Sequence, residues 1–182
     1  MKRNIRPFHF ALQIAAVIVS LAVSVIHVHA FDADASRGTL KGLTGFYVLI
    51  EELNPNIAKY DNVQKNHIGT QQLKSNVENR LRAAGIRVLS WDDMMKAPGR
   101  PILYVCVNLH EYEKFWYAYD IRLEVRQLVT LVNQPGKTIN GDTWSVNVTG
   151  VMNIGQIQKL YDNLEVLLGR LVSAYKTVNR NG

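Results

Sequence analysis

Histidine and cysteine are the side chains best suited to act as nucleophile, general base or metal ligand, and after residue 30 the chain has only His67, His110 and Cys106. His110-Glu111 begins like the zinc-protease motif HExxH, but Lys114 stands where the second histidine is required. A single cysteine can form neither a CxxC redox pair nor an internal disulfide. We interpret Cys106 as a small buried side chain of a strand, and we predict no metal site and no bound cofactor.

Two pairs of adjacent acids could suggest general acid–base catalysis: Glu51-Glu52 and Asp92-Asp93. Adjacent residues of a strand point to opposite faces, so Glu51 and Glu52 cannot share one site. Asp92 and Asp93 suit the positive N-terminal end of a short helix that Ser90 can cap. Neither pair therefore indicates a catalytic centre, and we predict no catalytic residue.

Basic residues do not indicate a nucleic-acid site. The first thirty residues hold three of the 21 basic residues and none of the 15 acidic ones, so the remainder has a net charge of about +3 without a dense basic run. Arg80, Arg82 and Arg87 lie close together in the sequence, either as a solvated, salt-bridged surface or, as the alternative, as an anion site. The phosphate-binding patterns GxxxxGK and GxGxxG and the hydrolase elbow GxSxG are absent.

The N-terminus has the three parts of a secretory signal peptide. Lys2, Arg3 and Arg6 precede an apolar run from Ala11 to Ile26, and Val28-His29-Ala30 loosely fits the small-x-small cleavage pattern. We predict a signal peptide over residues 1–30 with cleavage after Ala30, and a periplasmic or secreted protein whose mature domain does not span a membrane. An uncleaved membrane anchor is the alternative, although the run is short for a full span.

The stretch from Thr70 to Ser90 predicts a helix that leads directly into a strand. Thr70 can cap the helix, and an apolar stripe follows at helical spacing: Leu73, Val77, Leu81 and Ala84. Gly85 can adopt the left-handed conformation that ends a helix, and Ile86–Val88 alternates as a short strand does. The order helix, glycine, strand indicates an α/β joint.

Four further segments have the two-residue alternation or apolar runs of strands, and a long amphipathic helix begins at Ile154. The strands are predicted over 45–53, 102–110, 115–132 and 143–151, with a bulge near Gln127-Leu128. We predict an α+β fold, a two-layer sandwich whose mixed sheet of about five strands carries both long helices on one face. The expected organisation is a flexible lead-in at 31–43, one domain over 44–178 and a tail at 179–182.

If both helices cover one sheet face, the other face has no helix left to cover it. Tyrosine, tryptophan and arginine are enriched in binding hot spots. Strands 102–110 and 115–132 place four such residues on that face, and we predict them as the interaction surface: Tyr104, Trp116, Arg122 and Arg126. The expected occupant is a protein partner or a second copy of the chain.

The segment LKSNVENRLRAAGIRVLS, followed by PILYVCVNL, resembles uncharacterised exported bacterial proteins with such a core. The same topology is similar to small α/β domains of cell-envelope assembly proteins, such as the N-terminal domain of the periplasmic translocation protein TolB. This resemblance implies binding or assembly in the envelope. We therefore predict an exported, non-catalytic binding or adaptor domain. The alternative is a small exported hydrolase or metal-dependent enzyme that uses His67 or His110.

Overall fold

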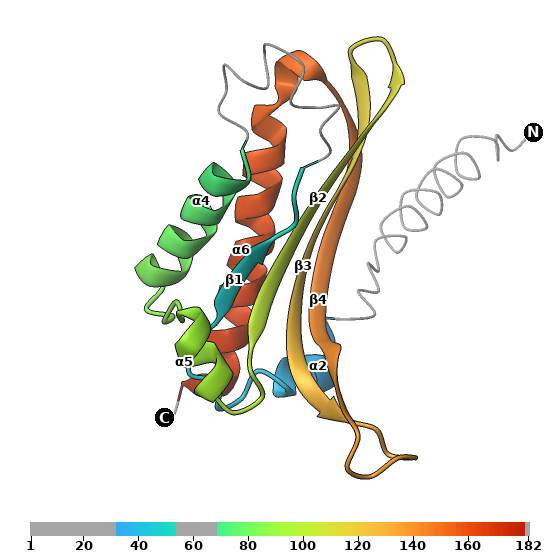
Figure 1. Ribbon diagram of the computed structural model, residues 1–182. Helices are drawn as coiled ribbons and strands as arrows, with labels where there is room; N and C mark the ends of the chain where they lie inside the picture. Colours follow the sequence, from blue (N-terminus) through green and yellow to red (C-terminus); the bar gives the residue numbers. More distant parts are fainter. Residues whose placement is uncertain (1–31, 54–68, 181–182) are drawn as a thin grey trace, which may run out of the picture. The chain divides into compact units, whose positions relative to one another are not determined.

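The computed structural model describes residues 32–53 and 69–180, so the predicted signal peptide and His67 lie outside the described residues. The helices and strands follow one another in the order shown in Figure 1: α2 (Asp34–Gly38), β1 (Tyr47–Ile50), α4 (Thr70–Ala83), α5 (Trp91–Lys96), β2 (Ile102–Glu113), β3 (Trp116–Thr130), β4 (Thr138–Asn153), the short 3-10 helix η1 (Ile154–Gln156) and α6 (Gln158–Asn179). No helix of this described part is long and apolar enough to cross a membrane.

The sheet is mixed, with the strand order β1-β2-β3-β4. β1 runs parallel to β2, and the other two pairs are antiparallel. The α+β class and the mixed sheet are therefore confirmed, but the count of about five strands is wrong for the described residues. Ile86–Val88 contributes only a single parallel bridge between Phe46 and Val88, because Ser90 caps α5 two residues later and ends the extended chain.

The joint after α4 is confirmed at Gly85. Its φ of +77° is left-handed, and the amide of Ile86 returns to the carbonyl of Leu81 at 2.9 Å, which satisfies a free carbonyl of the last turn. The predicted cap at the other end is wrong. Gly69 occupies the N-cap position and Thr70 is already helical, without a side-chain cap.

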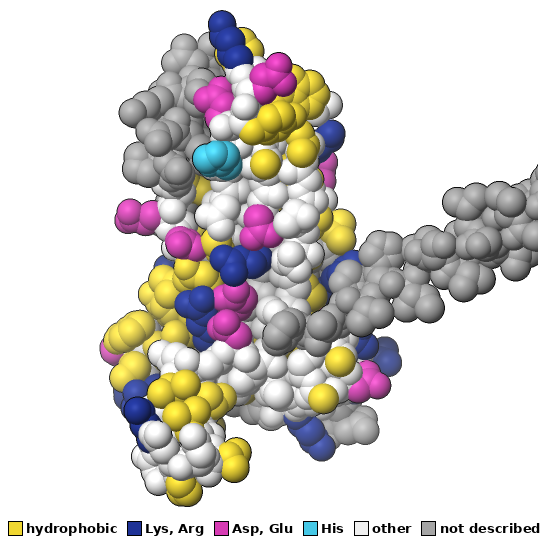
Figure 2. All heavy atoms as spheres, turned by 90° about the vertical axis from the view of Figure 1, so that its right-hand side faces the viewer, with side chains coloured by type: hydrophobic (Ala, Val, Ile, Leu, Met, Phe, Trp, Pro, Cys, Tyr) yellow, Lys and Arg dark blue, Asp and Glu magenta, His cyan; other side chains and the backbone are white. Residues whose placement is uncertain are grey.

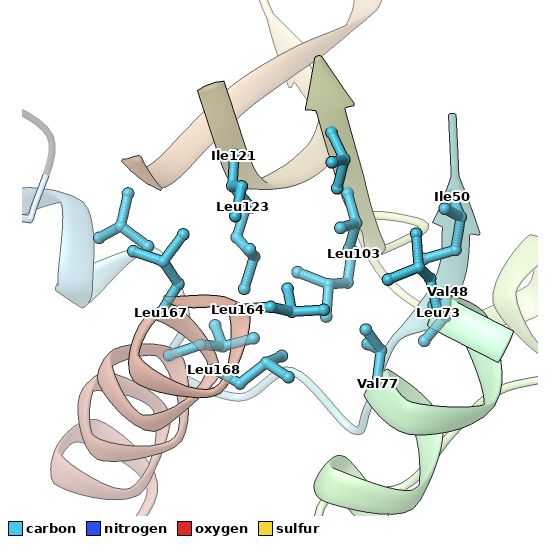
Figure 3. Close-up of a cluster of buried hydrophobic side chains, with 14 of the residues drawn as sticks. Val48, Ile50, Leu73, Val77, Leu103, Ile121, Leu123, Leu164, Leu167 and Leu168 are labelled. Carbon is cyan, nitrogen blue, oxygen red and sulfur yellow. The ribbon is translucent and has the colours of Figure 1, made fainter. Parts of the chain in front are cut away.

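One continuous core lies between the sheet and the two long helices. α4 and α6 lie on the same face of the sheet (Figure 1), and their apolar stripes meet the inward residues of the strands. Figure 3 shows the centre of this cluster: Val48, Ile50, Leu73, Val77, Leu103, Ile121, Leu123, Leu164, Leu167 and Leu168. The strand residues alternate in burial as the sequence predicts, since every second side chain points to the helices.

The described residues of the predicted lead-in, and Asn179 of the predicted tail, pack against the core. Leu40 and Leu43 are buried in the core, and the indole N–H of Trp144 donates to Asp32 at 3.1 Å. The side-chain amide of Asn179 donates to the carbonyl of Leu40 at 3.0 Å. The predicted boundaries at 43 and 179 are corrected, because two buried leucines and these hydrogen bonds attach the segments before and after the sheet to its core.

Two irregularities shape the long strands. β2 and β3 are joined by a two-residue turn at Lys114-Phe115, where Phe115 has a φ of +68°. The register between β3 and β4 shifts between Val125 and Arg126. The extra residue is Thr143 of β4, opposite Val125 and Arg126, so the bulge lies in β4 and not at Gln127-Leu128 of β3, where the sequence predicted it. A bulge of this kind increases the local twist of the strand pair.

Candidate functional site

The face of the sheet opposite the helices, here called the open face, carries a row of charges of alternating sign along β3. The row consists of Asp120, Arg122, Glu124 and Arg126, every second residue of the strand. Their neighbours Ile121, Leu123 and Val125 point into the core, so strand periodicity alone sends the charges to the other side. Figure 2 shows acidic and basic side chains together in the middle of this face.

Each arginine of the row is held by two carboxylates. Arg122 lies 3.1 Å from Asp120 and 3.4 Å from Glu124. Arg126 lies 2.7 Å from Glu124 and, across the strand pair, 3.0 Å from Asp142. Glu124 sits between the two arginines and its side chain is only 8% exposed. The charges are thus neutralised within the sheet, and the arginines are ordered rather than free to capture an anion.

Tyr104 completes the centre of the open face from β2. The guanidinium carbon of Arg126 lies 3.6 Å from the centroid of its ring, a cation–π contact. The carboxylate of Glu51, just after β1, raises the pKa of Tyr104 to about 12 through a hydrogen-bonding interaction, and burial adds to the effect. The phenol is therefore a proton donor at neutral pH and not a base.

Cys106 lies beside Tyr104 on the same face, but it is buried. Its sulfur accepts from the amide of Asn108 at 3.1 Å and from the guanidinium of Arg122 at 3.6 Å. Burial, and after it the interaction with Glu51, raises the pKa of the thiol to about 11. Since only the thiolate attacks as a nucleophile, Cys106 is inert near neutral pH and acts as a packing and hydrogen-bonding residue.

Of the four predicted interaction residues, the structure brings three together and separates the fourth. Tyr104, Arg122 and Arg126 form the centre described above. Trp116 lies six residues from Arg122 along β3, about 20 Å away at roughly 3.3 Å per residue. It is 41% exposed and shares the hairpin end with other exposed apolar side chains: Tyr112, Phe115 and Val151. Figure 2 shows hydrophobic side chains gathered at this end of the face.

His110 is an exposed residue of β2 that pairs with Ala118. Within residues 32–53 and 69–180, no group of three or more histidine, cysteine or acidic side chains is placed to hold a metal ion. His110 is therefore not part of such a group among the described residues.

The three arginines near the end of α4 do not converge on one point. Each forms an ion pair with a carboxylate of its own: Arg80 with Glu165 at 3.3 Å, Arg82 with Glu78 at 2.8 Å and Arg87 with Asp93 at 3.2 Å. This is the salt-bridged surface that the sequence favoured over an anion site.

Sequence reasoning did not identify Glu51, which lies just after β1, as a residue of the open face. Glu51 contacts Cys106 and Tyr104, and these interactions lower the pKa of its own carboxyl group. The signal that could have found it is the parallel register of β1 on β2, in which Ile50 pairs with Val105 and places the next residue beside Cys106.

No protein-family model, curated protein or solved structure matches this chain.

Proposed function

We propose that this protein is an exported, non-catalytic binding or adaptor domain of the bacterial cell envelope, and that the open face of its sheet receives a protein partner. One observation carries the proposal. α4 and α6 lie on one side of the four-stranded sheet (Figure 1), and tyrosine, tryptophan and arginine side chains of β2 and β3 lie on the other side. The predicted signal peptide and the resemblance to envelope domains support the compartment.

The chemistry of the open face suits a protein partner better than a small molecule or nucleic acid. Its centre is ion-paired, so it supplies fixed hydrogen-bonding groups without an excess of positive charge. The aromatic end at Trp116 supplies apolar area, the usual anchor of a protein interface. Because the arginines are already held in place, little side-chain entropy is lost when a partner binds.

The test is a double substitution of Trp116→Ala and Arg122→Ala, compared with Trp91→Ala and Arg87→Ala. The control pair has the same residue types and is also exposed, but it lies in α5 and the extended segment before it, where Trp91 packs on Tyr47 of β1, and not on β3. Proteins captured from envelope extract by the wild-type chain are identified and their dissociation constants measured against all three proteins.

We expect the open-face double variant to bind at least about tenfold more weakly, equivalent to roughly 1.4 kcal/mol, while the control binds as the wild type does. Both variants should melt close to the wild type, because neither pair is in the core. If the Trp116/Arg122 double variant folds and binds its partner as tightly as the wild type does, the open face is not the interaction surface.

A further inference from the structure

The outer edge of β4 is the longest free strand edge in the sheet. β4 has 16 residues and stands at the end of the strand order. Within residues 32–53 and 69–180, β3 is its only partner strand. An edge strand presents a row of backbone N–H and C=O groups to which another strand can be added.

The register shows which backbone groups of β4 point outward. The amide of Ile154 donates to the carbonyl of Phe115 at 2.9 Å. In an antiparallel ladder, hydrogen-bonded and non-hydrogen-bonded pairs alternate. Phe115 and Ile154 form a hydrogen-bonded pair, and the two kinds of pair alternate from there along β3 and β4. The residues Ile121 and Val148 are therefore hydrogen-bonded to each other, whereas Arg122 and Asn147 are not. The N–H and C=O of Asn147 therefore face the edge, as do those of the residues two places away, Ser145 and Thr149.

This part of the edge lacks the features that normally protect one. Natural edge strands are blunted by charges, proline, bulges or short length. Residues 145–153 contain neither a charged residue nor proline, and the register shift between β3 and β4 lies before them, between Asp142 and Trp144. The turn after α2 reaches the edge at one point, where the hydroxyl of Thr39 donates to the carbonyl of Thr143 at 3.2 Å. The outward groups from Ser145 to Thr149 lie beyond that contact.

The sequence of the same segment is nearly palindromic about Asn147. It reads Ser145-Val146-Asn147-Val148-Thr149, with a valine on each side of the asparagine and a hydroxyl residue beyond each valine. If two copies pair antiparallel about Asn147, valine faces valine, serine faces threonine and asparagine faces asparagine. Branched and hydroxyl pairs of this kind stabilise adjacent strands, and no like charges meet.

We propose that β4 is a self-pairing edge: two copies of this chain join antiparallel through Ser145–Thr149, with the two-fold axis at Asn147. In each copy, Ser145, Asn147 and Thr149 each donate one backbone hydrogen bond and accept one. The two sheets then continue into a single sheet of eight strands. This interface goes beyond the proposed partner surface, and it leaves Tyr104, Arg122 and Arg126 uncovered, so either proposal can fail without the other.

A matched pair of proline substitutions tests the edge. Asn147→Pro removes an outward N–H without breaking the ladder to β3, a position where edge strands accept proline. Asn140→Pro is the control. Asn140 is also an exposed residue of β4. The amide of Leu131 donates to the carbonyl of Lys137 at 3.2 Å, and the alternation of pairs from that bond makes the N–H of Asn140 face outward as well. It lies outside the palindromic segment.

Sedimentation of the protein expressed from the full 182-residue chain should show a monomer–dimer equilibrium. We expect Asn147→Pro to weaken dimerisation about tenfold or more and Asn140→Pro to leave it unchanged. A wild type that stays monomeric up to its limit of solubility overturns the proposal, and so does equal weakening by both variants.

Cysteine cross-linking tests the register and does not depend on how the proline variants fold. At a self-paired position the two α carbons lie about 5.5 Å apart, within reach of a disulfide. Mild oxidation should therefore link Asn147→Cys into a covalent dimer, while Asn140→Cys and the wild type, which has only the buried Cys106, stay unlinked. If the protein dimerises but oxidation does not link the Asn147→Cys variant, the interface lies elsewhere and the proposal is overturned.

Discussion

On one face of β3, Ile121, Leu123 and Val125 are fully buried against the helices. On the other face, residues of the same strand form ion pairs, with Arg122 between Asp120 and Glu124. The first face is stabilised by removal of apolar area from water. This free-energy contribution does not depend on charge screening by salt or on the orientation of the contacting groups. The second depends on the geometry of charges that stay partly hydrated, which contribute little each to stability.

The comparison teaches that a strand can separate folding from recognition by alternation alone. Packing of the core face fixes the position of β3. The charged and aromatic side chains of the open face therefore have a fixed spacing, although they contribute little to the stability of the fold. A substitution on the open face can therefore change binding while the fold persists. Two of the four predictions below test this division, and the other two concern the buried thiol of Cys106 on the open face.

The sharpest test uses two adjacent residues. Leu123→Ala should destabilise the protein by about 2–5 kcal/mol, because it deletes fully buried methyl groups and leaves a cavity. Arg122→Ala should cost less than about 1 kcal/mol, since its side chain is 44% exposed, Asp120 is partly exposed and Glu124 keeps its ion pair with Arg126. Denaturant unfolding of both variants measures the difference, and similar costs for the two would contradict the division of roles.

Glu124 is the most direct exception to the difference between the two faces of β3, because it lies on the open face but is buried between Arg122 and Arg126. Glu124→Gln keeps the shape, removes the charge and turns an amide N–H₂ toward a guanidinium. We expect a loss of about 1–2 kcal/mol, between the two values above. Raising the salt concentration should narrow the gap between variant and wild type, whereas a gap that ignores salt would indicate lost packing.

The next prediction concerns the reactivity of Cys106 and not stability at neutral pH, because the pKa of its thiol is about 11, compared with an ordinary value of 9.0. Near neutral pH its thiolate fraction, and hence its alkylation rate in the folded protein, should be roughly a hundredfold below that of an ordinary cysteine. Glu51→Gln should lower the pKa of Cys106 and speed alkylation, because it removes a carboxylate that disfavours the thiolate. The pH dependence of the alkylation rate gives both values.

The same pKa sets the direction of a stability change in alkali. The unfolded chain releases the thiol proton near pH 9, before the folded chain does near pH 11, so the contribution of Cys106 is complete below pH 9 and is lost between these values. A melting temperature that rises across this interval would show that burial does not protect the thiol.

Much of the fold could be predicted because local signals and tertiary packing agree. The left-handed Gly85 after a striped helix, the alternation through Leu103 and Leu123, and the helical period after Ile154 each indicate a structure on their own. The predicted strand at Ile86–Val88 was wrong because alternation cannot report how soon the next helix cap ends the pairing.

The candidate site was predictable only in part. Alternation placed Tyr104, Arg122 and Arg126 on one face, and the structure brings them together. The contacts of Glu51 with Cys106 depend on how β1 is registered on β2, and more than fifty residues separate the two positions. No local pattern encodes that register, since it is set by the packing of β1 under α4.

The parallel pairing of β1 with β2 has a consequence for the order in which the chain closes. β2, β3 and β4 follow one another through residues 102–153 and can pair through short turns, whereas β1 must wait until the segment between Ile50 and Ile102 has closed a long loop. Closing long loops is entropically costly and slows the contacts that depend on it. We therefore expect β2, β3 and β4 to pair early in folding and β1 to join them late. Since Glu51 reaches Cys106 only after that step, the protected thiol of Cys106 is a chemical marker of a completely closed sheet.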